Sequence, residues 1–390
     1  MIAPAYIPVF FFAFSLSAIT PVFPRYLAGL GAGVATIGVV VSMRGLGQVF
    51  SDMPGGFLLA RLGIRPVVVA SYVLSIVSNV ALYVLRDIPS IAAVVFVSGF
   101  FTSILITAIM ARVRTTVPAG MRGRALSGVG GSLRVGMLFG PVIGGVLAER
   151  FGVPVIFLVR AVAFAAGLTS YLAGATDTAR AASRDPAPFG LRDTLGRLRA
   201  GLAGRWYAIA TVGFAILILS ILRSAREVII PLWGEQLDLA PARIGFAMSI
   251  GAAFDLLLFF PSGIISDRFG RKTAVTVCLV GFSAGLLLIL PARGAALYIL
   301  AAAVVGVGNG FGAGINMTTG TDLAPSGAVA EFLGLWRLYG DLGAAAGPAI
   351  VGSITAVLAL GPAVAITAGI GLLGALVMAT IAPETRDISA

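Results

Sequence analysis

Charged side chains occur inside several stretches that are otherwise apolar, and these residues are the most able to do chemistry. The acids are Asp52, Glu227, Asp255 and Asp341. The arginines in similar positions are Arg44, Arg134, Arg160, Arg223, Arg226 and Arg337. A charge inside an apolar span is costly and by default indicates a function. A carboxylate in a partly dry site can trade its proton for an arginine or a bound molecule. We therefore predict proton carriers among the acids and their partners among the arginines, except that Arg160 is expected to extend to the outer surface.

The elements that must position these residues are membrane spans. The chain has 390 residues, of which 58% are hydrophobic and 11% charged, with a mean hydropathy of +1.03. Soluble domains are about half apolar and a quarter charged. Because a spanning helix needs roughly 20 mostly apolar residues, the sequence predicts an all-α polytopic membrane protein with twelve transmembrane helices. The predicted spans are 5–28, 35–59, 67–85, 90–111, 126–148, 154–175, 206–233, 242–265, 273–291, 294–317, 331–357 and 361–381.

The composition also excludes several classes of protein. The chain has no histidine and a single cysteine, Cys278, so we expect no disulfide, no zinc or haem site and no cofactor. The formal charge of +11 resides in short loops between spans, which indicates a lipid bilayer rather than a nucleic acid as the partner. No nucleophile–base set is present, so we expect neither catalytic residues nor an enzyme.

The chain repeats one unit twice. An offset of 207 residues pairs Pro24 with Pro231 and Pro54 with Pro261, and it continues without a gap over most of the half. We therefore predict an N-terminal six-helix bundle (1–175), a central loop (176–205) and a C-terminal six-helix bundle (206–390). Within the central loop, leucines recur at helical spacing opposite arginines, which favours an amphipathic helix on the membrane surface. A linker with solvated charges is the alternative.

Basic residues are distributed unequally between the two sides of the predicted bundle. Sixteen lie on the side of the central loop and five on the other side. Because cytoplasmic loops carry the excess of lysine and arginine, we predict a multi-pass protein of the inner (plasma) membrane with both termini in the cytoplasm.

A short charged turn connects two spans in each half. The second-half turn contains Gly263, Asp267, Arg268, Gly270, Arg271 and Lys272. The first-half turn contains Gly56, Arg61, Gly63 and Arg65, with Ala60 in place of the acid. Bases that only set the topology would not require Asp267, so its presence favours a latch between moving helices.

The span 126–148 carries small residues at regular spacing. They are Gly136, Gly140, Pro141, Gly144 and Gly145. Small residues at every fourth position let two helices approach closely, and the proline removes a backbone hydrogen bond and bends the helix. Tight packing alone would also account for the pattern.

The charged turns, the glycine-rich span and the repeat resemble the major facilitator superfamily over essentially the whole chain. The segment 263–272 resembles that family's cytoplasmic loop motif, G-x-x-x-D-R-x-G-R-[RK]. The segment 136–145 resembles the G-x-x-x-G-P-x-x-G-G motif, found mostly in antiporters that expel drugs with protons. The resemblance implies the major facilitator fold, in which two pseudo-symmetric bundles of six helices pack together.

The resemblance also implies contacts between the halves. In that fold, helices 2 and 11 pack together, as do helices 5 and 8. We therefore expect an Asp52–Arg337 pair and an Arg134–Asp255 pair, with Asp341 competing for Arg337.

The family's charged turns lock the inner ends of the halves in the outward-facing state. By analogy we expect Asp267 to meet Arg124 there. The offset of 207 makes Glu331 the repeat equivalent of Arg124, and Glu331 is expected to meet Arg61 or Arg65. Arg226 and Glu227 are expected either as an ion pair at the outer gate or as independent side chains.

The combined expectation is a secondary transporter that exports amphipathic small molecules in exchange for protons by alternating access. Its partners would be a small-molecule substrate, protons and lipid, and we expect a monomer. The alternative is a transporter of an anionic metabolite or lipid-like substrate held by the arginines in the spans. A membrane receptor or enzyme is a more distant alternative.

Overall fold

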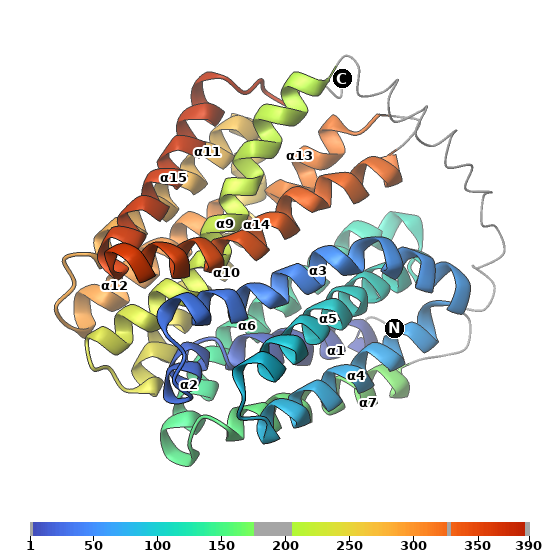
Figure 1. Cartoon of the computed structure of the whole chain (residues 1–390). Helices are drawn as coiled ribbons and strands as arrows, with labels where there is room; N and C mark the ends of the chain where they lie inside the picture. Colours follow the sequence, from blue (N-terminus) through green and yellow to red (C-terminus); the bar gives the residue numbers. More distant parts are fainter. Residues whose placement is uncertain (1–2, 175–204, 326–328, 387–390) are drawn as a thin grey trace.

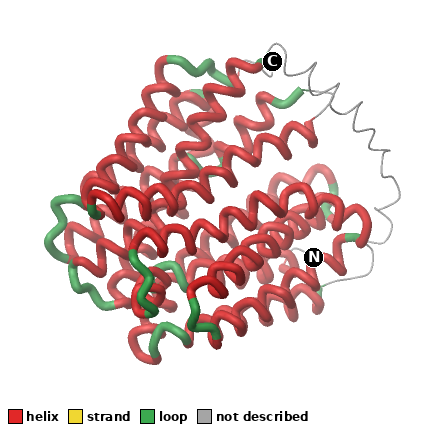
Figure 2. Tube along the Cα trace, viewed as in Figure 1, coloured by secondary structure: helices red, strands yellow, loops and turns green. Residues whose placement is uncertain are grey.

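The computed structural model describes residues 3–174, 205–325 and 329–386, and within these ranges the chain is helical with short turns and contains no strand (Figure 2). The first half contains α1 (Ala3–Ala18), α2 (Phe23–Gly29), α3 (Val34–Leu62), α4 (Ile64–Val84), α5 (Ile88–Thr116), the 3₁₀ turn η1 (Ala119–Met121), α6 (Arg122–Phe151) and α7 (Val155–Ala173). The second half contains α9 (Trp206–Gln236), α10 (Pro241–Phe269), α11 (Arg271–Ile289), α12 (Ala295–Phe311), α13 (Ile315–Leu323), α14 (Val329–Leu358) and α15 (Leu360–Thr380). The amphipathic helix predicted in the central loop lies outside the described residues.

Eleven helices in the described part are long and apolar enough to cross a membrane, and a bent helix pair raises the number to twelve. This agrees with the predicted all-α fold of twelve spans. The bent pair replaces the single helix predicted over 5–28: α1 ends at Ala18, and α2 continues at an angle of 42°. Pro24 occupies the first turn of α2, where its missing N–H leaves no hydrogen bond unmade.

The predicted span 294–317 is also interrupted. It consists of α12 and α13, separated by a turn in which Gly314 adopts a φ of +75°. An L side chain rarely adopts this left-handed conformation, so glycine suits the turn.

The helices of each half lie side by side in Figure 1, and the most extensive contacts between the halves are those of α3 with α14 and of α6 with α10; α2 also contacts α9. The contacts are close where the facing residues are glycines. A Cβ atom added at Gly45 would lie 2.5 Å from the backbone nitrogen of Ala345, and one added at Gly245 would lie 2.1 Å from the carbonyl oxygen of Pro141. Toward the charged turns the halves diverge in Figure 1. There, added Cβ atoms at Gly131 and Gly263 would meet nothing within 4 Å.

The contact between α6 and α10 leads to a stability prediction. We expect Gly245→Leu to destabilise the protein by about 1–3 kcal/mol, because overpacking forces the backbones apart. A lowered melting temperature in detergent would measure this effect. Gly369→Leu is the matched control, since an added Cβ at this exposed position of α15 meets nothing within 4 Å. Equal melting temperatures for the two variants would contradict the packing described here.

Candidate functional site

The two charged turns have the same backbone shape. Gly63 joins α3 to α4 with φ +82° and ψ 167°, and Gly270 joins α10 to α11 with φ +89° and ψ 158°. Both angles lie in the region that favours glycine. The repeat seen in the sequence therefore extends to the conformation of these turns.

The second turn is held by ion pairs and hydrogen bonds to residues of the second half. Arg271 forms ion pairs with Asp267 on α10 and, at 3.2 Å, with Asp322 on α13. The carboxylate of Glu384 accepts hydrogen bonds from the backbone nitrogens of Arg271 at 2.9 Å and Lys272 at 3.1 Å. Glu384 thus satisfies N–H groups that begin α11 and have no partner within the helix.

The predicted latch contact between Asp267 and Arg124 is not seen in this conformation. Asp267 pairs with Arg271 instead of Arg124, and its side chain is 72% exposed. The physical reason is that the halves diverge at this end, whereas the prediction concerns the state in which they meet. The side chain of Glu331 lies outside what the structure describes, so its contact with Arg61 or Arg65 stays a prediction. Arg61 lies over the ring of Phe57, 5.9 Å from its centroid.

A polar network surrounds Asp255, which is 6% exposed in the middle of α10. The structure brings Arg134 of α6 to this acid, with 3.6 Å between Nε and the carboxylate. Asn309 of α12 donates a hydrogen bond to the other carboxylate oxygen at 2.9 Å. Arg223 of α9 in turn donates to Asn309 at 2.6 Å. The network thus joins the two halves through the Arg134–Asp255 contact.

Arg337 is the centre of a second network. Its Nε lies 3.3 Å from Asp52 of α3 and 3.0 Å from Asp341, one turn along α14. Its terminal nitrogens donate to Thr107 at 2.8 Å and to Ser103 at 2.6 Å, both on α5. Both oxygens of Asp52 are buried without a hydrogen bond. The expected Asp52–Arg337 pair and the competing Asp341 are therefore both present. The Asp52 carboxylate has an ion-pair partner but no hydrogen-bond donor.

A third contact between the halves was not predicted as such. Arg44 of α3 and Glu227 of α9 form an ion pair at 2.5 Å. Of the two alternatives for Arg226 and Glu227, an ion pair between them is not seen in this conformation, because successive residues of a helix point about 100° apart. Arg226 lies near the ring of Phe282, 5.8 Å from its centroid.

Arg160 does not extend to the outer surface as expected. Its side chain is only 6% exposed, and Nε donates to the backbone oxygen of Ser15 at 2.7 Å. The hydroxyl of Ser15 returns a hydrogen bond to the backbone oxygen of Arg160 at 3.1 Å. Packing of α7 against α1 thus holds this arginine inside the bundle.

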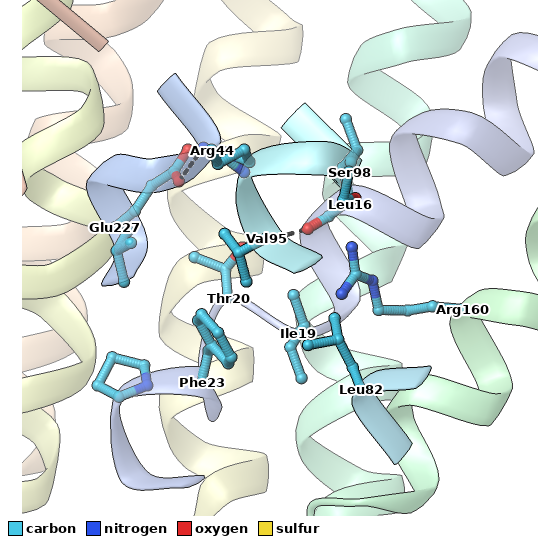
Figure 3. A pocket seen from close by; sticks show the side chains of 12 residues that line it. Leu16, Ile19, Thr20, Phe23, Arg44, Leu82, Val95, Ser98, Arg160 and Glu227 are labelled. Carbon is cyan, nitrogen blue, oxygen red and sulfur yellow. Dashed lines mark hydrogen bonds and ion pairs between the residues drawn. The ribbon is translucent and has the colours of Figure 1, made fainter. Parts of the chain in front are cut away.

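A cavity of about 220 Å³ lies between the halves. Its polar lining includes Arg44 and Gln48 from α3 and Arg226 and Glu227 from α9, and its other walls are mainly apolar. A smaller cavity of about 50 Å³ shares Arg44 and Glu227 with it and extends toward Arg160 (Figure 3). Cavities of this kind, apolar with a few charged groups, are typical of small-molecule sites.

The glycines of the motif at 136–145 lie in close contacts of α6. Added Cβ atoms would lie 2.6 Å from the carbonyl oxygen of Phe10 at Gly136, 1.9 Å from that of Ala18 at Gly144, and 2.4 Å from that of Pro241 at Gly145. A Cβ atom added at Gly140 would lie 2.0 Å from the hydroxyl oxygen of Ser17 on α1. The motif therefore packs α6 against both α1 and α10.

Several residues of these networks carry no sequence signal that distinguishes them as site residues. Ser103 and Thr107 differ from other hydroxyls in apolar spans only by facing Arg337. Asp322 ends a span, and Glu384 follows the last one, so both resemble ordinary loop acids.

This arrangement, with two helical bundles around a cavity and charged groups between them, defines a secondary transporter fold. The family model described as "Major Facilitator Superfamily" matches residues 6–225 and 212–389. The chain therefore belongs to the major facilitator superfamily, whose members are transporters and not enzymes.

Two relatives match only part of this chain in sequence. The multi-drug resistance efflux pump PmrA of Streptococcus pneumoniae is 26% identical over 151 residues, which cover 37% of this chain and 37% of the pump. The MFS-type transporter ppzB of Metarhizium rileyi is 28% identical over 121 residues, covering 31% of this chain and 25% of the relative.

Solved structures share the fold over nearly the full length. A D-xylose–proton symporter superposes with a TM-score of 0.81 at 15% identity, covering 99% of this chain and 98% of the symporter. A peptide transporter in complex with sulfate gives a TM-score of 0.82 at 16% identity, covering 99% and 95% of the two chains. At this identity the likeness concerns the fold alone.

Proposed function

We propose that this major facilitator transporter exports amphipathic small molecules in exchange for protons. The observation that carries the proposal is the position of buried acids in ion pairs that connect the two halves. Asp255 meets Arg134, and Asp52 meets Arg337, across surfaces that would separate when the cavity opens to the other side. Protonation of either acid would then depend on conformation.

The cycle that we propose uses the arginines as internal counterions. While α6 and α10 are together, Arg134 keeps Asp255 ionised. When they separate, the acid loses its partner and binds a proton, because an unpaired charge in the span is costly. Asp52, Asp341 and Glu227 are the further candidate proton carriers.

The shape and lining of the central cavity support an amphipathic substrate. Its walls are mainly apolar, with an arginine from each half, Arg44 and Arg226. The similarity to an efflux pump and the glycine motif at 136–145 support export. We place the protein in the plasma membrane as a monomer, with both termini in the cytoplasm. In that orientation the conformation seen here would open inward.

The arginines also support the second candidate function, transport of an anionic metabolite or lipid-like molecule. Uptake of labelled ethidium and of labelled 2-naphthalenesulfonate into proteoliposomes with an imposed pH gradient would separate the candidates. Movement of either compound above the level of empty liposomes is expected for a transporter. Competition by lipophilic cations indicates the first candidate, and competition by organic anions alone indicates the second. A pH gradient without effect on either flux would contradict proton coupling.

A further inference from the structure

Arg160 is a buried arginine without a carboxylate partner. None of the ion pairs in the described part of the chain includes it, and its Nε donates to the backbone oxygen of Ser15. The two terminal nitrogens have no hydrogen-bond partner among the described residues. Figure 3 shows the guanidinium directed into the smaller cavity. A buried positive charge without a counterion is costly, so the site suits an anion supplied from outside the chain.

The smaller cavity has the size and lining for one anionic group. Its volume is about 50 Å³, room for a few water molecules at roughly 10–15 Å³ each. Ile19, Leu82 and Val95 supply apolar walls, and Ser98 lines the same cavity. The hydroxyl of Ser98 has no hydrogen-bond partner among the described residues, so it could donate to the same anion.

The smaller cavity adjoins the larger one. Leu16 and Thr20 line both, as do the paired residues Arg44 and Glu227. The opposite charges of that pair compensate each other at 2.5 Å, so Arg160 remains the uncompensated charge of the smaller cavity. A molecule that occupies both cavities would place a small charged end at Arg160 and an apolar body between the halves.

We propose that Arg160 binds the anionic group, carboxylate or sulfonate, of an amphipathic organic monoanion whose apolar body lies in the larger cavity. The proposal rests on the second candidate function, transport of an anionic molecule, and specifies its substrate class. The terminal nitrogens of a guanidinium donate two parallel hydrogen bonds, which matches two oxygens of such a group. The acid that lines the smaller cavity, Glu227, is already paired with Arg44.

Binding to the purified protein in detergent tests this site without requiring transport. The probe is tritiated 2-naphthalenesulfonate, with 2-naphthylmethylammonium and 2-naphthylmethanol as competitors of the same shape. We expect the sulfonate to bind at least about tenfold more tightly than the ammonium compound, as expected for hydrogen bonds to a charged group. A folded wild-type protein that does not bind the sulfonate, or that prefers the ammonium compound, would overturn the proposal.

Variants then assign the binding to Arg160. Arg160→Met is expected to weaken sulfonate binding about tenfold or more and to leave naphthylmethanol binding nearly unchanged. Arg160→Lys should retain part of the affinity. Arg112→Met is the matched control, because Arg112 contacts the other end of α7 through Tyr171 and Gly174, away from the cavity.

A second substitution keeps the test decisive if Arg160→Met does not fold. Ser98→Asp places a carboxylate in the cavity and is expected to remove sulfonate binding while Arg160 stays in place. Unchanged sulfonate affinity in folded Ser98→Asp or Arg160→Met would overturn the proposal. Sulfonate binding without flux in proteoliposomes would instead contradict the second candidate function and leave the anion site standing.

Discussion

Asp255→Asn is expected to abolish substrate accumulation driven by a pH gradient, while substrate binding and exchange persist. Asparagine retains the shape of the side chain and its hydrogen bond with Asn309, but it cannot release a proton. Arg134 then loses its charged partner in one state of the cycle. Accumulation in proteoliposomes with an imposed gradient, measured beside exchange without a gradient, separates the two activities.

The control for this experiment is Asp238→Asn. Asp238 lies in the turn between α9 and α10 with a φ of +52°, a conformation that asparagine also tolerates. We expect this variant to accumulate substrate like the wild type. If Asp255→Asn also pumps at a rate near the wild type, Asp255 is only structural, and Asp52→Asn becomes the next variant to measure.

Arg337→Met is expected to cause the largest loss of stability among the single substitutions considered. It removes the partner of Asp52 and Asp341 and leaves two acids with side chains 11% and 17% exposed. Removing one partner of a buried ion pair costs about 3–5 kcal/mol. Because the side chain of Arg337 is itself 37% exposed, we expect the free energy of unfolding to fall by about 3 kcal/mol, the lower end of that range. Thermal unfolding in detergent measures the change.

A rescue experiment tests the reason for that loss. Adding Asp52→Asn and Asp341→Asn to Arg337→Met removes the uncompensated charges and should restore a large part of the stability. Arg337→Lys keeps the charge but cannot reproduce the geometry that reaches Ser103 and Thr107, so we expect an intermediate value. A variant with all three substitutions that is no more stable than Arg337→Met alone would contradict the ion-pair account.

The fold could be predicted because each of its elements leaves a strong periodic signal. Long apolar runs determine the spans, and Pro54 and Pro261 show the repeat on which the bundle is built. The breaks at 19–22 and 312–314 were missed, because a chain that stays apolar through a bend has the hydropathy of a continuous helix. Only the backbone angles show the difference.

The candidate site was predictable where two charges occupy helices known to pack together. Arg134–Asp255 and Asp52–Arg337 are of this kind. The Arg44–Glu227 contact was missed because the neighbouring Arg226 offered a partner closer in sequence, although it points another way. The burial of Arg160 depends on how α7 packs against α1, which a single sequence does not specify.

The central claim, that substrate and protons move in opposite directions through this protein, is tested most directly by measuring both fluxes together. Proteoliposomes would contain a pH-sensitive dye and a permanently charged substrate from the flux assay, ethidium or 2-naphthalenesulfonate, with the membrane potential clamped by potassium and valinomycin. Diluting the vesicles makes the substrate leave along its own gradient. We predict that the lumen acidifies as the substrate leaves, and that Asp255→Asn releases substrate without this acidification. Release of substrate by the wild type with no change in lumenal pH would contradict proton exchange.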